Sequence, residues 1–386
     1  MLNHLLATAA AASTLTLAQY STAQSVGVGE ATLRFEAIGS LSYYSNPYLR
    51  DDFLDDILPV EDSFAFILDP TAILELGDEE SHYELSGNAG LLIRRFDSIS
   101  ALDAEDFHVD LNAAFRSEKS YWNLNAAFAE VSLPEHHTRS SDVTPESDRT
   151  NFNWNGSYRY STRTRIIGGL RYSERSFADS SQFDFSDWDY FSVPLRFVYQ
   201  MTEKIELGGG VRYRSISQES FDQPSDLAWH LALEGEISTK VTTDLKIGIL
   251  DQSGSVNTSS ADGDLFINLK TRWQATDDSG VVLELDRDSY PTGLNDSVLR
   301  QLIKISSDWK VSTKLLAQAS ISQMKESFDR SSREDTVDRV SIALNYLPSD
   351  SQLFSSVSLS YEDNDSNIVG FDYTSTLLNW TTGWRF

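Results

Sequence analysis

Arginine is the residue type whose spacing in this sequence most directly suggests a site. Six arginines between residues 159 and 214 would share one face of successive strands: Arg159, Arg165, Arg171, Arg196, Arg212 and Arg214. Few acids other than Glu206 would share that face. Because a guanidinium pairs well with carboxylate or phosphate, the set predicts a basic track that contacts anionic groups, such as those of acidic sugars. The alternative is that acids on neighbouring strands pair with these arginines and make the wall rigid, since buried charges are normally paired.

Acidic residues are expected on the same face in other parts of the chain. They are Glu36, Asp69, Glu75, Glu84, Asp106 and Asp110 early in the sequence, and Glu234, Glu236 and Asp244 after the arginines. The pattern predicts an inner surface that is basic along one arc and acidic along others. Opposed charges across a pore set up a transverse field, which orients polar solutes and disfavours apolar ones.

Histidines near acids raise the possibility of an enzyme. His108 lies between Asp106 and Asp110, and His136 and His137 follow a glutamate. Serine and aspartate are so abundant that this proximity means little, and neither Gly-x-Ser-x-Gly nor His-Glu-x-x-His occurs. The acidic loops match no defined calcium-loop spacing, and the absence of cysteine excludes thiolate metal sites. We therefore expect no catalysis, no cofactor and no metal.

The elements that must position these residues alternate with a period of two, as β-strands do. In the last stretch, apolar Leu378, Trp380, Trp384 and Phe386 alternate with polar residues. Trp380, Trp384 and Phe386 suit a membrane interface, and a last strand ending on an aromatic residue resembles the assembly signal of bacterial outer-membrane barrels. The alternative is the last strand of a soluble sandwich.

Alternating segments recur along most of the chain, each about 10–14 residues long, which is the length a tilted strand needs to cross a bilayer. Eight short connections alternate with nine longer ones, which predicts eighteen strands, or sixteen if the hairpin around 281–306 is misread. An even number places both chain ends on the periplasmic side. Because an open sheet edge is unfavourable in lipid, we predict an all-β, antiparallel, up-and-down transmembrane barrel over residues 24–386.

Composition and the first residues give the expected location. Residues 1–23 are rich in Ala, Leu and Thr and end in Ser21-Thr22-Ala23, which predicts a cleaved secretory signal, although no Lys or Arg precedes the apolar run. The alternative is a disordered tail. The net charge of −27 argues against nucleic acid as a partner. We expect a protein of the bacterial outer membrane, in contact with lipid and lipopolysaccharide and inserted by the barrel assembly machinery.

One stretch carries a resemblance to a known family. Tyr43-Tyr44-Ser45-Asn46-Pro47-Tyr48 is followed by an acidic loop and then by Asp62-Ser63-Phe64-Ala65-Phe66-Ile67-Leu68-Asp69-Pro70. With the barrel pattern, this resembles the β-barrel porin 2 family, whose members often show Asp-Asn where this chain has Ser45-Asn46. The resemblance implies a conduit for exopolysaccharide export, working with periplasmic export components.

Two other functions remain open from the sequence: a general diffusion porin for small polar solutes, and a structural or adhesive barrel that transports nothing. A long loop folded into the lumen would favour the porin, and Asn46–Asp62 and Leu133–Arg149 are the candidate loops. A lumen plugged by side chains would favour the structural barrel. A continuous bore with exposed arginines would favour export.

Overall fold

The computed structural model describes residues 26–28, 31–51, 61–77, 81–132, 146–178, 186–218, 225–253, 263–292, 297–329, 331–348 and 351–385. The predicted signal at 1–23, the last residue Phe386 and most of the Leu133–Arg149 loop lie outside them. In the described part, no helix is long and apolar enough to span a bilayer.

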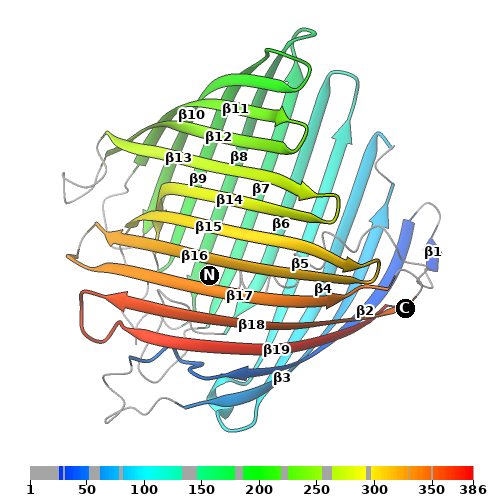
Figure 1. Ribbon diagram of the computed structural model, residues 1–386, viewed down its shortest axis with the longest axis vertical. Coiled ribbons are helices and arrows are strands. Elements are labelled where there is room, and N and C mark those ends of the chain that lie inside the picture. Colours follow the sequence, from blue (N-terminus) through cyan, green and yellow to red (C-terminus); the bar gives the residue numbers. More distant parts are fainter. Residues whose placement is uncertain are drawn as a thin grey trace.

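Eighteen long antiparallel strands form one closed sheet, so the predicted strand number is confirmed (Figure 1). Each strand pairs with the next, and β19 pairs with β2 to close the barrel. A three-residue strand, β1 (Val26–Val28), adds to the edge of β2. The strands are β2 (Ala31–Tyr44), β3 (Ser63–Leu76), β4 (Tyr83–Phe96), β5 (Ala104–Arg116), β6 (Ser120–Val131), β7 (Ser147–Arg159), β8 (Thr164–Phe177), β9 (Trp188–Gln200), β10 (Ile205–Gln218), β11 (Ser225–Ser238), β12 (Val241–Ser253), β13 (Asp264–Thr276), β14 (Ser279–Pro291), β15 (Ser297–Ser312), β16 (Leu315–Phe328), β17 (Glu334–Tyr346), β18 (Leu353–Ser366) and β19 (Tyr373–Arg385).

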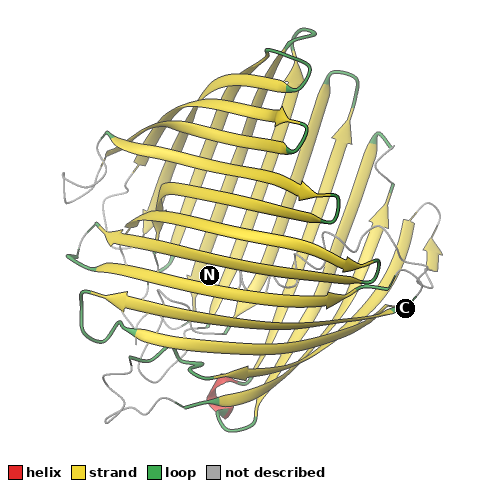
Figure 2. Ribbon diagram, in the orientation of Figure 1, coloured by secondary structure: helices red, strands yellow, loops and turns green. Residues whose placement is uncertain are grey.

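The two ends of the barrel differ in their connections. At one end, here called the short-turn end, brief turns such as 239–240 and 277–278 join the strands. At the other, the long-loop end, the connections are longer and include the helical turn η2 (Ser100–Leu102), which is coloured red in Figure 2. The start of β2 and the end of β19 both lie at the short-turn end, as an even strand number requires.

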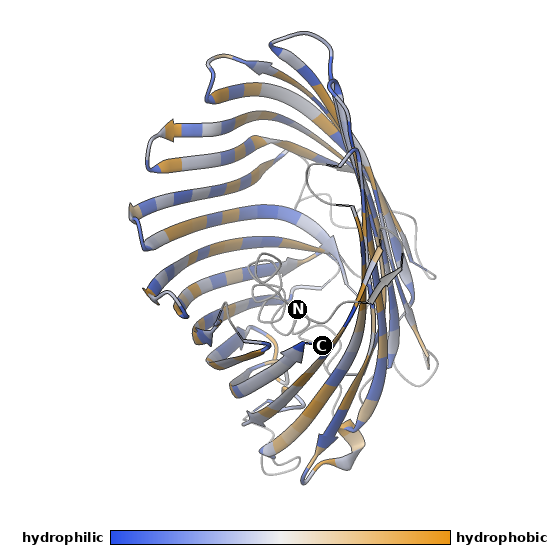
Figure 3. Ribbon diagram, turned by 90° about the vertical axis from the view of Figure 1, so that its right-hand side faces the viewer, coloured by the Kyte–Doolittle hydropathy of each residue, from blue (hydrophilic) through white to orange (hydrophobic). Residues whose placement is uncertain are grey.

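Side chains alternate between an outer and an inner face along every long strand. Figure 3 shows the alternation of apolar and polar residues along individual strands. Apolar and aromatic side chains such as Phe197, Trp229, Ile321 and Trp380 are more than half exposed on the outer surface. In a soluble protein such a continuous apolar surface would be unfavourable, whereas a lipid-facing barrel requires it. On β19, Trp380 and Trp384 both lie on this outer face.

Candidate functional site: the lumen wall

The residues predicted to carry function lie on the inner face of the barrel. Arg196 and Arg212 alternate with Phe197 and Tyr213, which are 55% and 45% exposed on the outer surface. Strand alternation therefore directs both arginines into the lumen. The same alternation places all six predicted arginines inward: Arg159 on β7, Arg165 and Arg171 on β8, Arg196 on β9, and Arg212 and Arg214 on β10.

Near the short-turn end, two of these arginines share one glutamate. Nη2 of Arg165 donates to Oε2 of Glu234 at 3.0 Å, and its Nε donates to Glu206 at 3.1 Å. Nη1 of Arg196 lies 2.6 Å from Oε1 of the same Glu234. Glu206 is on β10 and Glu234 is on β11, so this network joins four consecutive strands, β8 through β11. The charges on this part of the wall are therefore largely balanced.

Toward the long-loop end, Arg212 and Arg214 form a buried network with Asp226 and Asp288. Arg212 donates to Asp288 at 2.8 Å and to Asp226 at 3.2 Å, and Nε of Arg214 donates to Asp226 at 2.6 Å. Asp288 is on β14, four strand spacings from β10, or about 19 Å along the wall. Their contact shows that the wall curves so strongly here that side chains meet across the lumen. Asp226 and Asp288 were not among the acids predicted to face inward, so the sequence prediction missed the partners of Arg212 and Arg214.

The remaining two arginines have a different environment. Arg159 and Arg171 are exposed to the lumen, and neither has an acidic partner among the residues that the structure describes. Arg159 pairs in register with Arg165, and Arg171 pairs with Asn153. Of the six predicted arginines, these two are the exposed residues without a described acidic partner, so a solute in the lumen can reach their guanidinium groups.

His108 has an ordinary partner in the wall. It lies 3.0 Å from Oδ1 of Asp69, which also accepts a hydrogen bond from Thr71 at 2.9 Å. His108 thus bridges β5 to β3 over Gly90 of β4, where an added Cβ would lie 2.5 Å from its Nε2. The His108–Asp69 pair therefore links β5 to β3 across Gly90, which has no side chain to separate them. His136 and His137 lie outside the described residues.

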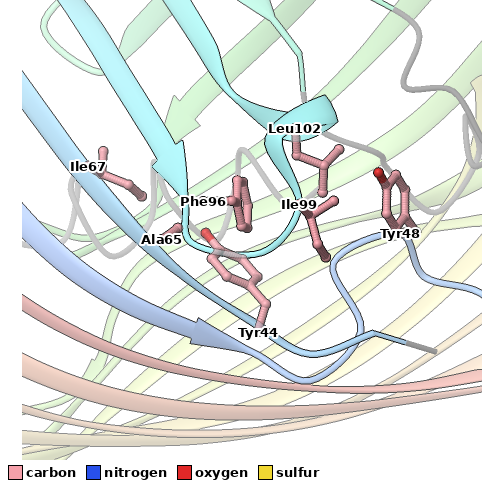
Figure 4. Packing of buried hydrophobic residues seen from close by; sticks show 7 residues of the cluster. All are labelled: Tyr44, Tyr48, Ala65, Ile67, Phe96, Ile99 and Leu102. Carbon is pink, nitrogen blue, oxygen red and sulfur yellow. The ribbon is translucent and has the colours of Figure 1, made fainter.

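An apolar cluster fills the long-loop end of the barrel beside β2–β4. Inward side chains Tyr44, Ile67 and Phe96 belong to one cluster with Ile99 and Leu102 of the loop that follows β4 (Figure 4). Tyr48, from the start of the predicted Asn46–Asp62 loop, lies in the same cluster. This part of that loop therefore folds over the lumen, whereas residues 52–60 lie outside the description.

Hydrogen bonds fix the two loops that cover this cluster, the one after β2 and the one after β4; these two loops are called here the cover. Asn46 donates through Nδ2 to the carbonyl of Arg50 at 2.8 Å and to that of Thr374 at 3.1 Å. Asp97 accepts from Ser63 Oγ at 2.6 Å and from the Phe64 N–H at 2.9 Å, and the Ser63 bond is the main reason why the pKa of Asp97 is lowered. The two loops are thus tied to three strands, β2–β4, and to β19.

Replacing Leu102 with serine is expected to loosen the cover and to raise single-channel conductance. Leu102 is 1% exposed, so a hydroxyl there loses apolar contacts and gains no described partner. The measurement is conductance of the refolded barrel in a planar bilayer. Val369→Ser serves as control, because Val369 is 72% exposed on another long loop and should leave conductance unchanged. Equal conductance of the Leu102 variant and the unaltered protein would show that this cover does not restrict the lumen.

A polar pocket of about 700 Å³ lies at the long-loop end of β4–β8. Its lining includes Glu105, Asp106, Glu130 and Asp148, with Arg95 beside them. Among the described residues, no group of three His, Cys, Asp or Glu side chains is placed to hold a metal ion. The lining residues make it an acidic recess at the long-loop end of the wall.

The inner face of β5–β7 contains a group of asparagines that the charge-based prediction did not include. Asn112, Asn123, Asn125, Asn151, Asn153 and Asn155 are all half-buried and lie side by side across three strands; they are called here the asparagine wall. The sequence signal was present, because Asn151, Asn153 and Asn155 repeat with the strand period. Across the lumen, β15–β18 present serines inward: Ser306, Ser320, Ser322, Ser341, Ser356, Ser358 and Ser360.

These features define the class of the protein. A closed 18-strand antiparallel barrel with an apolar outer face and a polar lumen is the architecture of porin-type outer-membrane β-barrels. The model of the family described as "Putative beta-barrel porin 2" matches residues 235–382, so the predicted resemblance is confirmed over that range. The stretch from Tyr43 to Pro70 lies outside the match. The sequence matches no curated protein.

Solved structures are also similar to this chain. OccAB3 of Acinetobacter baumannii is 10% identical with a TM-score of 0.49, and the match covers 92% of this chain and 99% of that one. OpdK of Pseudomonas aeruginosa is 12% identical with a TM-score of 0.48 and the same coverage. A bacterial polysaccharide outer membrane secretin is 10% identical with a TM-score of 0.41, covering 91% of this chain and 98% of that one.

Proposed function

We propose that this protein is an outer-membrane channel for carbohydrate, and that it carries polysaccharide out of the cell. The observation that supports the proposal is the composition of the inner wall. Most of its arginines are balanced by acids, and much of the remaining area is amide and hydroxyl. Such a wall keeps water in the lumen and offers hydrogen bonds to a polyhydroxyl chain. The direction of transport rests on the family resemblance.

The arginines have two roles in this proposal. Arg159 and Arg171, which have no acidic partner among the described residues, contact the passing solute. The other four keep the wall rigid through their acids. A guanidinium without a carboxylate can donate to sugar hydroxyls as well as to anionic groups.

The surroundings of the channel are part of the proposal. The outer face contacts lipid and lipopolysaccharide, with Trp380 and Trp384 near an interface. The barrel assembly machinery would recognise the last strand, including Phe386, and periplasmic export components would deliver the chain, since the barrel itself supplies no energy.

A diffusion porin for small polar solutes is the second candidate, and the apolar cluster favours it. Tyr48, Ile99 and Leu102 narrow one side of the long-loop end, as a porin constriction does. A narrow opening passes small solutes more readily than a polymer.

Single-channel conductance with added sugar separates these functions. We expect an open channel whose current is blocked by oligosaccharide added at the short-turn side, and we expect Arg159→Ser with Arg171→Ser to weaken the block. The matched control is Arg196→Ser, because Arg196 is paired with Glu234. A single-channel current that added oligosaccharide does not change would support the diffusion porin. A folded barrel without current would exclude both transport functions and leave the structural one.

A further inference from the structure

We infer that the asparagine wall is a binding track for an uncharged carbohydrate chain. This inference rests on the proposed channel function and names the chemical class of its substrate. It differs from the anionic substrate that the arginines alone would suggest.

With Ser86 and Arg171 at its ends, the asparagine wall forms a row of paired inward residues that crosses five strands, β4 to β8. Strand pairing places Asn112 beside Asn125, Asn125 beside Asn153, and Asn153 beside Arg171. Ser86 of β4 continues the row on the other side of Asn112. A second row joins Asn123 to Asn155. Polar groups therefore recur at each strand spacing, about 4.8 Å.

Existing hydrogen bonds use only part of the capacity of these amides. Asn123 donates to Asn112 Oδ1 at 3.0 Å, Asn125 donates to Asp110 at 3.0 Å, and Asn151 accepts from Ser173 at 2.7 Å. Oδ1 of Asn153 is shielded and accepts no hydrogen bond from any described residue. Because each amide has two donor hydrogens and two acceptor lone pairs, the wall keeps unused donors and acceptors; the shielded Oδ1 of Asn153 would meet a solute after rotation of its side chain.

Amides match sugar hydroxyls better than they match charged groups. A hydroxyl donates and accepts at once, and so does a side-chain amide, so neighbouring asparagines can pair with neighbouring hydroxyls. Tyr121, on the inner face at the short-turn end and 41% exposed, adds a ring against which the apolar face of a sugar can pack.

The charges of the lumen argue against a polyanion. In the arginine networks, four cations (Arg165, Arg196, Arg212 and Arg214) face four anions (Glu206, Glu234, Asp226 and Asp288), so they contribute no net charge. The asparagine wall has one cation at one side, Arg171 on β8, and one anion at the other, Asp110 on β5, so these two residues add no net charge to it. The anionic groups of a polyanion would lose hydration on entering the lumen, and no excess of positive charge on the wall would compensate for that loss. A neutral chain does not have this desolvation cost.

Calorimetric binding to the refolded barrel tests this inference without requiring an open pore. The detergent must lack a sugar headgroup. The probes are a neutral malto-oligosaccharide and an oligogalacturonate of equal length. We expect the neutral probe to bind more tightly, and Asn125→Leu with Asn153→Leu to weaken its binding about tenfold, the loss expected for two neutral hydrogen bonds. The control is Thr276→Ala with Ser279→Ala, which removes two exposed hydroxyls that lie 2.7 Å apart at the β13–β14 turn, outside the lumen wall; this variant should bind within about twofold of the unaltered protein.

The isosteric change Asn153→Asp keeps the test valid if the leucine variant does not fold. This variant loses the amide donors of Asn153 and gains a negative charge. We expect it to bind the neutral probe less than about tenfold more weakly than the unaltered protein does, and to lose more affinity for the acidic probe. Tighter binding of the acidic probe, or neutral binding that survives the Asn125 and Asn153 changes, would overturn the inference. Neutral binding at the asparagine wall without sugar block or flux in bilayers would instead reject the channel function and leave the binding track standing.

Discussion

Replacement of Asp288 with alanine is expected to destabilise the barrel by about 3–5 kcal/mol, because it removes the carboxylate shared by two buried guanidinium groups. The side chains of Arg212 and Arg214 are 14% and 5% exposed, so water cannot replace the lost partner. The measurement is the free energy of unfolding in urea, followed by the shift in gel mobility between folded and heated barrel.

An exposed ion pair provides the control for Asp288→Ala. Asp308 pairs with Arg272 at 2.8 Å, but the Arg272 side chain is 41% exposed. Asp308→Ala should therefore cost less than about 1 kcal/mol. If the two variants lost similar stability, burial of the Arg212 network would not be the source of its contribution.

Replacement of Gly248 with alanine is expected to disrupt the pairing of β11 with β12. An added Cβ would lie 1.7 Å from the carbonyl oxygen of Trp229 and 2.6 Å from Cα of His230. Both are backbone atoms, so no side-chain rotation can relieve the overlap, and the strands must separate. We expect a loss of about 3 kcal/mol or more in unfolding free energy, and a smaller yield of folded barrel.

A glycine on the other strand that flanks β11, Gly209 of β10, tests whether the effect is steric. At Gly209 an added Cβ would meet only ordinary contacts at 3.8 Å, so Gly209→Ala should change stability by less than about 1 kcal/mol. Normal folding of the Gly248 variant would show that the two strands can move apart at little cost.

The barrel itself could be predicted from the sequence because its pattern is local. The alternation around Trp380 and Trp384 identifies an outer face within a few residues, and the same rule directs Arg196 and Arg212 inward. The alternation of short and long connections then gives the strand number. Neither inference depends on which residues from distant strands come into contact.

The partners of the arginines could not be predicted in the same way. Asp288 reaches Arg212 across 76 positions of sequence and four strand spacings, and this contact depends on the curvature of the wall. The asparagine wall was missed for another reason. Its signal is local, at Asn151, Asn153 and Asn155, but a search for charged or catalytic side chains passes over neutral amides.

The seam between β2 and β19 has a consequence for the order of folding. Ser40 and Thr381, whose hydroxyls lie 2.9 Å apart across it, are 341 residues apart in the chain. Until β19 is in place, a growing sheet has two open edges, each with unpaired backbone groups. The entropy cost of closing so long a loop is modest, since each doubling of length adds only about 0.6 kcal/mol, but such distant contacts form slowly. Closure of the seam is thus expected to set the rate of insertion, and a factor that holds the free edge of β2 would accelerate it without changing the final stability.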